Sequence, residues 1–240
     1  EGGILALYAL LRKMKRKWIY LLAIIGASTL LADGIITPAI TVTTAIEGLE
    51  SISPHLPVIP ITLGIITIIF FVQRFGTESI GKSFGVFMLI WFLLLGVMGA
   101  FSITSYPLIL KAFNPYYAIV LLAQSPEWFL ILGAVFLCTT GAEALYSDLG
   151  HCGRKNITIS WLFVKAMLIL NYLGQGAWVL NHVQTASSVN PFFSIMPQSM
   201  LIFAIIMATG AAIVASQALI SGTFSILSEA MNLHFWPRMR

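Results

Sequence analysis

The sequence predicts an all-α polytopic membrane protein. Hydrophobic residues make up 58% of the chain and charged residues only 9%, whereas an ordinary globular domain carries roughly 25% charged residues. Long apolar stretches follow one another, and nearly all positive charges lie in the polar segments between them. Because so little polar surface could not cover a soluble fold, we expect a single, partial transmembrane domain over residues 1–240.

Six apolar spans account for most of the chain. We expect membrane-crossing helices at approximately 18–44, 57–73, 84–106, 128–150, 157–180 and 200–228. Their lengths are close to the roughly 20 residues with which a helix crosses a hydrocarbon core of about 30 Å. Residues 1–11 are typical of the last turns of a helix that begins earlier in the same chain.

Positive charge predicts the orientation of these spans. One set of loops carries most of the 13 lysine and arginine residues, namely Arg12, Lys13, Lys15, Arg16, Lys17, Arg74, Lys82, Arg154, Lys155, Arg238 and Arg240. The opposite loops carry only Lys111, while Lys165 lies inside the fifth span, from which its long side chain can reach the interface. Cytoplasmic loops are enriched in lysine and arginine, so we expect the basic loops and both ends of the chain to be cytoplasmic.

The first span contains a carboxylate far from either membrane surface. Between Trp18 and Thr44 the only charged side chain is Asp33, which lies about 22 Å along a helix that starts at Trp18. A charged side chain at the centre of a bilayer costs about 2.5–3.5 kcal/mol even on the lower scales. Asp33 is therefore expected to face the protein interior or a water-filled cavity.

Further oxygen atoms lie on the same face of this expected helix. Thr37 and Thr41 follow Asp33 at i+4 and i+8, and Pro38 lacks the N–H that would bond to the carbonyl of Gly34. Such oxygens suit a hard cation. A purely structural interpretation stays open, because threonine often bonds to its own helix and proline can simply kink a membrane helix. The buried carboxylate favours the functional interpretation.

The fourth span contains a second acidic group. Glu143 lies 15 residues after Trp128, with Thr140 on the same face at i−3. Gly141 is a place where a membrane helix can unwind. Close packing between helices would explain the glycine. It would not explain Glu143, because a buried carboxyl group costs free energy unless it is protonated or meets a cation.

Six motifs occur in a fixed order over nearly the whole chain. They are Asp33-Gly-Ile-Ile-Thr-Pro-Ala-Ile, Gln73-Arg-Phe-Gly-Thr, Gly81-Lys-Ser-Phe-Gly85, Thr140-Gly-Ala-Glu-Ala-Leu-Tyr-Ser-Asp-Leu-Gly-His151, Asn171-Tyr-Leu-Gly-Gln-Gly176 and Ser216-Gln-Ala-Leu-Ile-Ser-Gly222. Together they resemble the KUP/HAK/KT family of potassium uptake permeases. Ala32, Val86 and Cys152 depart from the family pattern, and Thr41 stands where serine is common but keeps the hydroxyl.

The resemblance implies a secondary transporter that takes up potassium by proton symport. It also implies the fold of the amino acid/polyamine/organocation superfamily, in which two inverted five-helix repeats surround a site at the membrane midplane. On that plan the spans are helices three to eight, and the first two helices and the later ones lie outside this segment. The implied potassium-binding residues are Asp33, Thr37, Thr41, Thr140 and Glu143.

The resemblance and the residues together assign further roles. Glu143 and Asp33 are the candidates for proton coupling, and Gly34, Pro38 and Gly141 are the candidates for helix breaks. No cofactor is expected beyond the transported potassium and proton, and no other metal. The expected surroundings are the lipid bilayer of a bacterial inner membrane, nucleic acid is not an expected partner, and a homodimer stays open.

Other functions compete with potassium symport as interpretations of the sequence. An amino acid or other organic cation permease of the same superfamily is the closest alternative, and two acidic sites favour an inorganic cation over it. A potassium channel would need carbonyl-lined filter loops, which the sequence lacks. A non-transporting sensor or scaffold is a third class. An enzyme is not expected, since no nucleophile and base pair is recognisable.

Overall fold

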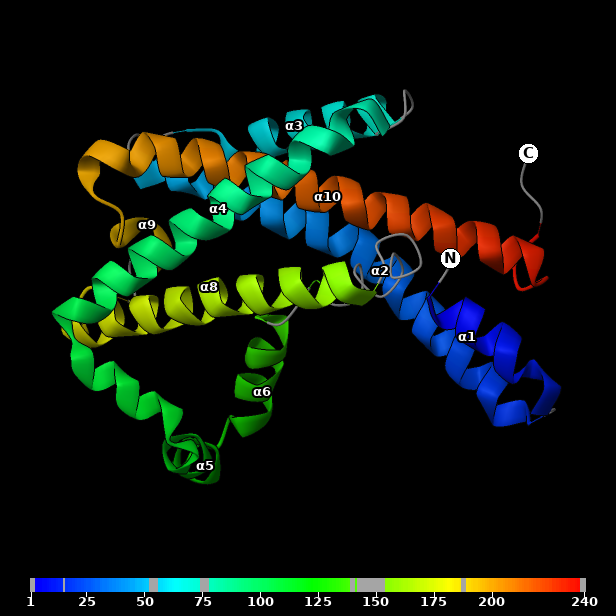
Figure 1. The fold of residues 1–240 in the computed structure, drawn as a ribbon, viewed down its shortest axis with the longest axis horizontal. Coiled ribbons are helices and arrows are strands. Elements are labelled where there is room, and N and C mark those ends of the chain that lie inside the picture. The colour runs from blue at the N-terminus through cyan, green and yellow to red at the C-terminus, as the bar shows by residue number, and fades with distance from the viewer. Residues whose placement is uncertain are drawn as a thin grey trace. The chain divides into compact units, whose positions relative to one another are not determined.

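All regular elements in the described part of the chain are helices. The computed structural model describes residues 3–14, 16–51, 56–73, 78–138, 141, 154–186 and 189–237. Its α-helices, drawn in Figure 1, are α1 (Ile4–Leu11), α2 (Lys17–Glu47), α3 (Val58–Gln73), α4 (Glu78–Ser105), α5 (Pro115–Gln124), α6 (Trp128–Leu137), α8 (Arg154–Asn181), α9 (Pro191–Ser194) and α10 (Leu201–Asn232). Short 3₁₀ segments lie at Arg12–Met14, Gly48–Ser51, Pro107–Phe113 and Gln198–Met200.

Four helices within these described ranges are long and apolar enough to cross a membrane. They cover Lys17–Glu47, Phe84–Ser105, Lys155–Asn181 and Gln198–Asn232. Only a helix or a closed barrel satisfies its own backbone groups in lipid, which explains why apolar segments of this length are helical. Large apolar side chains such as Ile35 and Phe101 lie about three-quarters exposed. These features confirm the predicted all-α, multi-pass integral membrane protein.

The helices belong to two compact units. Unit 1 comprises Glu1–Leu89, Glu143–Ile159 and Ile202–Arg240, and unit 2 comprises Ile90–Ala142 and Ser160–Leu201. Unit 1 therefore contains α1, α2, α3 and nearly all of α10. Unit 2 contains α5, α6, α9 and most of α8.

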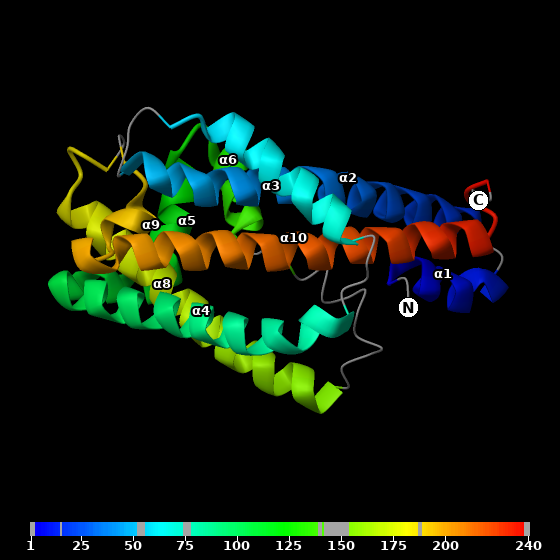
Figure 2. The ribbon, with the colours of Figure 1, turned by 90° about the horizontal axis from the view of Figure 1, so that it is seen from above.

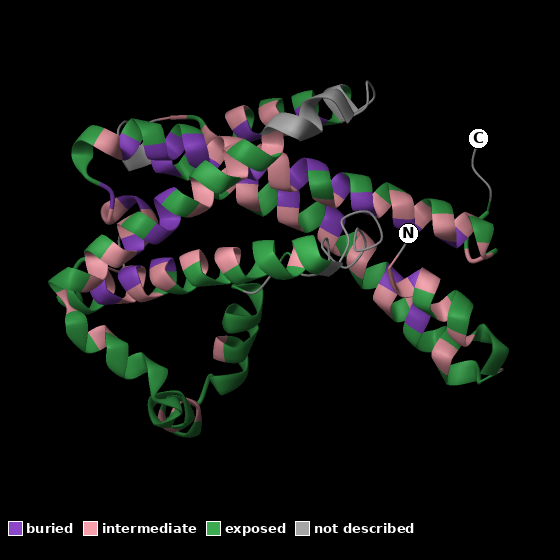
Figure 3. Ribbon diagram, viewed as in Figure 1, coloured by how far each residue is buried: buried purple, intermediate pink, exposed green. Residues whose placement is uncertain are grey.

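Helices α2 and α10 form the centre of unit 1. They run antiparallel in both ribbon views (Figures 1 and 2), and Gly34 of α2 lies against Thr223 of α10. A buried cluster joins Leu5 of α1 and Ala27 of α2 to Ile226 and Ala230 of α10. Buried residues recur along α10 between exposed ones (Figure 3). Small residues at such contacts let two helix backbones approach closely.

Helix α3 also belongs to this packing. It lies against α2, and the buried side chain of Gln217 in α10 donates a hydrogen bond from Nε2 to the carbonyl of Ile69, at 3.3 Å. In a membrane such a bond satisfies a backbone carbonyl and an amide N–H that have no water to bond. The glutamine therefore fixes α3 against α10.

Two glycines, Gly99 of α4 and Gly174 of α8, form a close helix–helix contact within unit 2. A Cβ atom at Gly174 would overlap with the backbone of Gly99, and one at Gly99 would overlap with the carbonyl of Leu170. The hydroxyl of Ser102 donates to the carbonyl of Gly174 at 2.8 Å. These two helices therefore approach more closely than any residue with a side chain would allow.

Candidate cation-binding site

The candidate site lies halfway along α2. Asp33 is about 24 Å from the first residue of this 31-residue helix and about 21 Å from the last, at 1.5 Å per residue. The helix forms because its core is strongly apolar and it packs against α1 and α3 and, near Gly34, against α10. Asp33 is thus held at mid-depth by a rigid element of unit 1.

Thr37 fixes the orientation of the Asp33 side chain. Its hydroxyl donates to Oδ1 of Asp33 at 2.5 Å, across one turn of the helix. The hydroxyl of Thr41 donates to the carbonyl of Thr37 at 2.7 Å and approaches that of Pro38 at 3.3 Å. All three side chains are half-buried. Thr37 and Thr41 thus both donate their hydroxyl hydrogen within α2. The lone pairs of both hydroxyl oxygens stay available to a ligand.

The second carboxylate oxygen of Asp33 has no partner among the described residues. Oδ2 is buried and accepts no hydrogen bond from that part of the chain. A buried anionic oxygen without a compensating charge or donor is strongly unfavourable. A cation or a proton at Oδ2 would remove this cost, so the geometry favours a bound positive charge next to Asp33.

Thr223 of α10 lies against the site and was not among the residues assigned from sequence. A Cβ atom at Gly34 would overlap with the hydroxyl of Thr223, so only glycine allows α10 to come this close to the turn of Asp33. Thr223 donates to the carbonyl of Leu219 at 2.8 Å. The sequence indicates a hydroxyl-rich last span, but it does not indicate which of these hydroxyls meets α2.

Helix α2 continues through both residues expected to break it. Gly34 and Pro38 are buried inside the uninterrupted span Lys17–Glu47. The ring of Pro38 still removes the donor for the carbonyl of Gly34, one residue from Asp33. The burial of both residues and the contact with Thr223 explain why α2 stays helical here. A freed carbonyl is therefore available without unwinding.

The residues of the second acidic group, Thr140 and Glu143, lie outside the described residues; Gly141 between them is described. Helix α6 ends at Leu137, and Gly141 has a φ of 109°, in a region that side-chain-bearing residues rarely adopt. Tyr172 of α8 donates its hydroxyl to the carbonyl of Cys138, at 2.7 Å. The end of α6 is thereby tied to α8 within unit 2.

The similarity of the chain to known proteins agrees with the motifs. A family model described as the K+ potassium transporter integral membrane domain matches residues 1–240. The chain is 52% identical over 246 residues to the "Probable potassium transport system protein Kup" of Flavobacterium psychrophilum. It is 54% identical over 256 residues to the protein of that name from Latilactobacillus sakei, and 50% identical over 256 residues to that from Enterococcus faecalis.

These matches cover all of this chain and a minor part of each relative. The covered share is 38% of the Flavobacterium protein, 37% of the Latilactobacillus protein and 38% of the Enterococcus protein. No solved structure matches the chain. The match to the family model over all residues nevertheless confirms the resemblance drawn from the motifs. The chain belongs to the family defined by the K+ potassium transporter integral membrane domain.

Proposed function

We propose that the full-length protein takes up potassium ions across the membrane and that Asp33 binds the ion. The observation that carries this proposal is the buried Oδ2 atom of Asp33, without a partner among the described residues, in the middle of a long apolar helix. The relatives are named as potassium transport proteins, which supports potassium as the cation. Membership of the family supports the same choice.

Potassium must lose much of its hydration shell to occupy such a site. Protein oxygens have to replace the lost water oxygens. Oδ2 of Asp33 supplies the charge, while the hydroxyls of Thr37 and Thr41 and the carbonyl of Gly34 supply neutral oxygens on the same helix. In this proposal Thr140 and Glu143 complete the set from the fourth span. A site with many neutral oxygens and few charges can both bind a monovalent cation and release it.

The same carboxylates provide a mechanism for proton coupling. Symport requires that the proton and the potassium ion are bound together, so in this proposal they occupy different carboxylates at the same time. Binding of each then changes the affinity for the other, and this linkage is reciprocal. We assign the coupling to Glu143, with Asp33 as the second acid. In this proposal the two acids occupy successive positions along one pathway.

The proposal also covers the fold of the full-length protein. The inverted five-helix repeat of the amino acid/polyamine/organocation superfamily would place the described helices at positions three to eight, around a midplane site. An amino acid permease of that superfamily is disfavoured because such sites hold the substrate carboxylate with backbone N–H groups at helix ends. At mid-depth of α2 there is instead a carboxylate, which would repel a substrate carboxylate.

Potassium uptake at two external pH values tests this function. The full-length protein is produced in cells that lack other potassium uptake systems, and uptake against the potassium gradient is followed with and without a proton gradient. The wild type is expected to accumulate potassium faster at the lower external pH. Glu143→Gln keeps the shape of the side chain and removes its titration, so it is expected to abolish accumulation driven by protons.

The outcome separates coupling from binding. Persistent uphill uptake by Glu143→Gln, with unchanged pH dependence, would transfer the coupling role to Asp33. Absence of potassium uptake by the correctly inserted wild-type protein would contradict the proposed function itself.

A further inference from the structure

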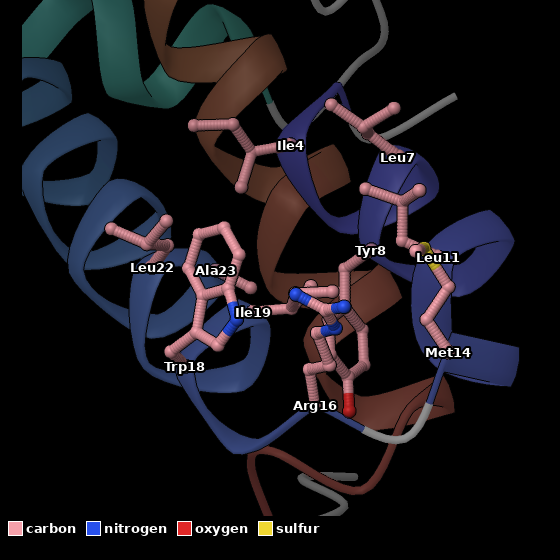
Figure 4. A pocket seen from close by; sticks show the side chains of 10 residues that line it. All are labelled: Ile4, Leu7, Tyr8, Leu11, Met14, Arg16, Trp18, Ile19, Leu22 and Ala23. Atoms are coloured by element: carbon pink, nitrogen blue, oxygen red, sulfur yellow. The ribbon is translucent and has the colours of Figure 1, made fainter.

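A cavity lies between α1 and the start of α2, away from Asp33. Its volume is about 470 Å³, within the range of about 300–1,000 Å³ typical of small-molecule sites. Trp18 and Leu22 of α2 lie on one side, and Leu7, Leu11 and Met14 lie on the other (Figure 4). Most of the lining is therefore aliphatic or aromatic.

The walls of this cavity are fixed by packing in unit 1. On its far face α1 inserts Leu5 between α2 and α10, and Ile4 packs against Gly26 so closely that a Cβ there would lie 2.6 Å from the Ile4 side chain. The ring of Tyr8 lies 5.1 Å from that of Phe235 and 6.2 Å from that of Tyr20. The cavity is thus a formed feature of the fold.

A second cavity adjoins the first at its basic end. Its volume is about 250 Å³, and it shares Tyr8, Leu11, Arg16 and Ile19 with the first. Its other lining residues are Arg12, Lys17 and Tyr20, and the three cations Arg12, Arg16 and Lys17 are exposed. None of the three forms an ion pair with an acidic side chain in the described ranges. Among the described residues, the positive charge of the basic end therefore has no ion-pair partner.

The two cavities lie at the start of the apolar helix α2, where a phospholipid beside a membrane-spanning helix would change from tail to headgroup. Helix α2 begins at Lys17 and becomes apolar at once, and the aromatic residues Trp18, Tyr20 and Tyr8 are of the kind enriched at membrane interfaces. An apolar cavity on the bilayer side and a basic one on the water side match the two parts of an anionic lipid. Basic pockets at this depth between helices are suited to acidic headgroups.

We propose that the paired cavities bind one anionic phospholipid, with part of an acyl chain in the larger cavity and the phosphate in the smaller. Arg12 and Arg16 donate to the phosphate oxygens, which suit the planar guanidinium group better than an ammonium, and Lys17 adds charge. A free phosphate ion would leave the apolar cavity empty. A neutral phospholipid would leave the three cations uncompensated.

The test uses the purified full-length protein in detergent. Thermal unfolding is followed with added phosphatidylglycerol, phosphatidylcholine, or inorganic phosphate at equal concentrations. Phosphatidylglycerol is expected to raise the Tm by at least twice as much as phosphatidylcholine, and inorganic phosphate is expected to change it little. Arg12→Gln/Arg16→Gln is expected to lose at least half of the shift caused by phosphatidylglycerol.

Matched variants keep this result specific to the paired cavities. Lys111→Gln/Lys155→Gln removes two exposed cations elsewhere and should retain the full shift. Arg12→Lys/Arg16→Lys keeps the charge and should retain an intermediate shift, which shows that the altered site still folds. Equal shifts from both lipids, an undiminished shift in Arg12→Gln/Arg16→Gln, or an equal effect of inorganic phosphate would overturn the proposal. If another part of the full-length chain fills the cavity, the Tm shift caused by phosphatidylglycerol should be undiminished in Arg12→Gln/Arg16→Gln. Potassium transport does not enter the readout.

Discussion

One carboxylate oxygen of Asp33 is held by a hydrogen bond, and the other has no partner among the described residues. Its Oδ1 atom accepts from Thr37, while its buried Oδ2 atom accepts nothing from the described residues. A carboxylate that served only to hold the helix together would be expected to use both oxygens, because an unsatisfied buried oxygen costs free energy. We therefore propose that a positive charge binds at this oxygen.

Thr41 is predicted to contribute an oxygen to the potassium ion. Thr41→Val keeps much of the shape and removes that oxygen, so binding of potassium should weaken by about 1–3 kcal/mol. The measurement is the half-saturation concentration of potassium uptake by the full-length protein. Thr43→Val is the matched control, because Thr43 makes an equivalent bond to the carbonyl of Ala39, at 2.7 Å, but lies about 200° further around the helix.

An equal change in both valine variants would show that only the helix, and not the site, was altered. Unchanged half-saturation in Thr41→Val would remove Thr41 from the site.

Local spacing explains which site residues could be predicted. The i+4 relation between Asp33 and Thr37 predicts adjacent side chains, and the hydrogen bond joins them. Thr223 lies 189 positions after Gly34 in the chain, and the contact between them depends on how two helices pack. Hydrophobic periodicity gives the buried face of a helix but not its partner. A hydroxyl on a neighbouring helix could therefore not be assigned from sequence.

At the scale of the helices, the contact between Gly34 and Thr223 sets how closely α2 and α10 approach. The two helices have the small buried residues that close packing in a membrane requires, such as Ala27 and Ala230. This contact lies one residue from Asp33. Packing and the geometry of the site are thus coupled.

Gly34→Ala is predicted to destabilise the protein. The added methyl group would overlap with the hydroxyl of Thr223, and overpacking of this kind costs about 1–3 kcal/mol. The Tm of the purified full-length protein measures the effect. Gly64→Ala in α3 is the matched control, since a Cβ there meets nothing within 4 Å in the described part of the structure. Its Tm should stay the same or rise, because alanine favours helix.

A double variant tests the cause of that destabilisation. Thr223→Ala removes the overlapping hydroxyl, so Gly34→Ala/Thr223→Ala should recover much of the loss in Tm. No recovery would mean that another contact of Gly34 is responsible.

Helix continuity was harder to predict than helix position. A proline and a glycine predict a break in α2, but the helix runs from Lys17 to Glu47, because neighbouring turns and buried contacts hold both residues. Gly141 has a φ of 109° after the end of α6. The same residue type thus serves close packing at one position and a non-helical backbone at another, and tertiary contacts decide between them.

At the scale of the whole molecule, lysine and arginine residues are distributed unevenly among the segments that flank the helices. Basic residues are concentrated before α2 and at the start of α8. The 3₁₀ and α-helical segments between Pro107 and Gln124 carry a single basic residue, Lys111. Composition and span length therefore predict the fold class and an orientation. They do not predict the arrangement of the spans, because this depends on pairings between helices, including those beyond this segment.

The predicted orientation places the end of α10 in the cytoplasm and the segment after Pro107 outside. Single cysteines at Gln124 and Asn232, introduced into a cysteine-free full-length protein, report on the two sides. A thiol reagent that cannot cross the membrane should label the Gln124→Cys variant in intact cells, and should label Asn232→Cys only after the cells are opened. The reverse pattern would contradict the orientation derived from the positive charges.

The central claim is that Asp33 binds the transported potassium ion, and equilibrium binding tests it most directly. Potassium binding to the purified full-length protein is measured by calorimetry for the wild type, for Asp33→Asn and for Glu47→Gln, which removes an exposed carboxylate at the end of the same helix. Asp33→Asn is predicted to weaken binding by at least about tenfold, equivalent to about 1.4 kcal/mol, while Glu47→Gln retains the affinity of the wild type. Wild-type affinity in a correctly folded Asp33→Asn variant would contradict the claim.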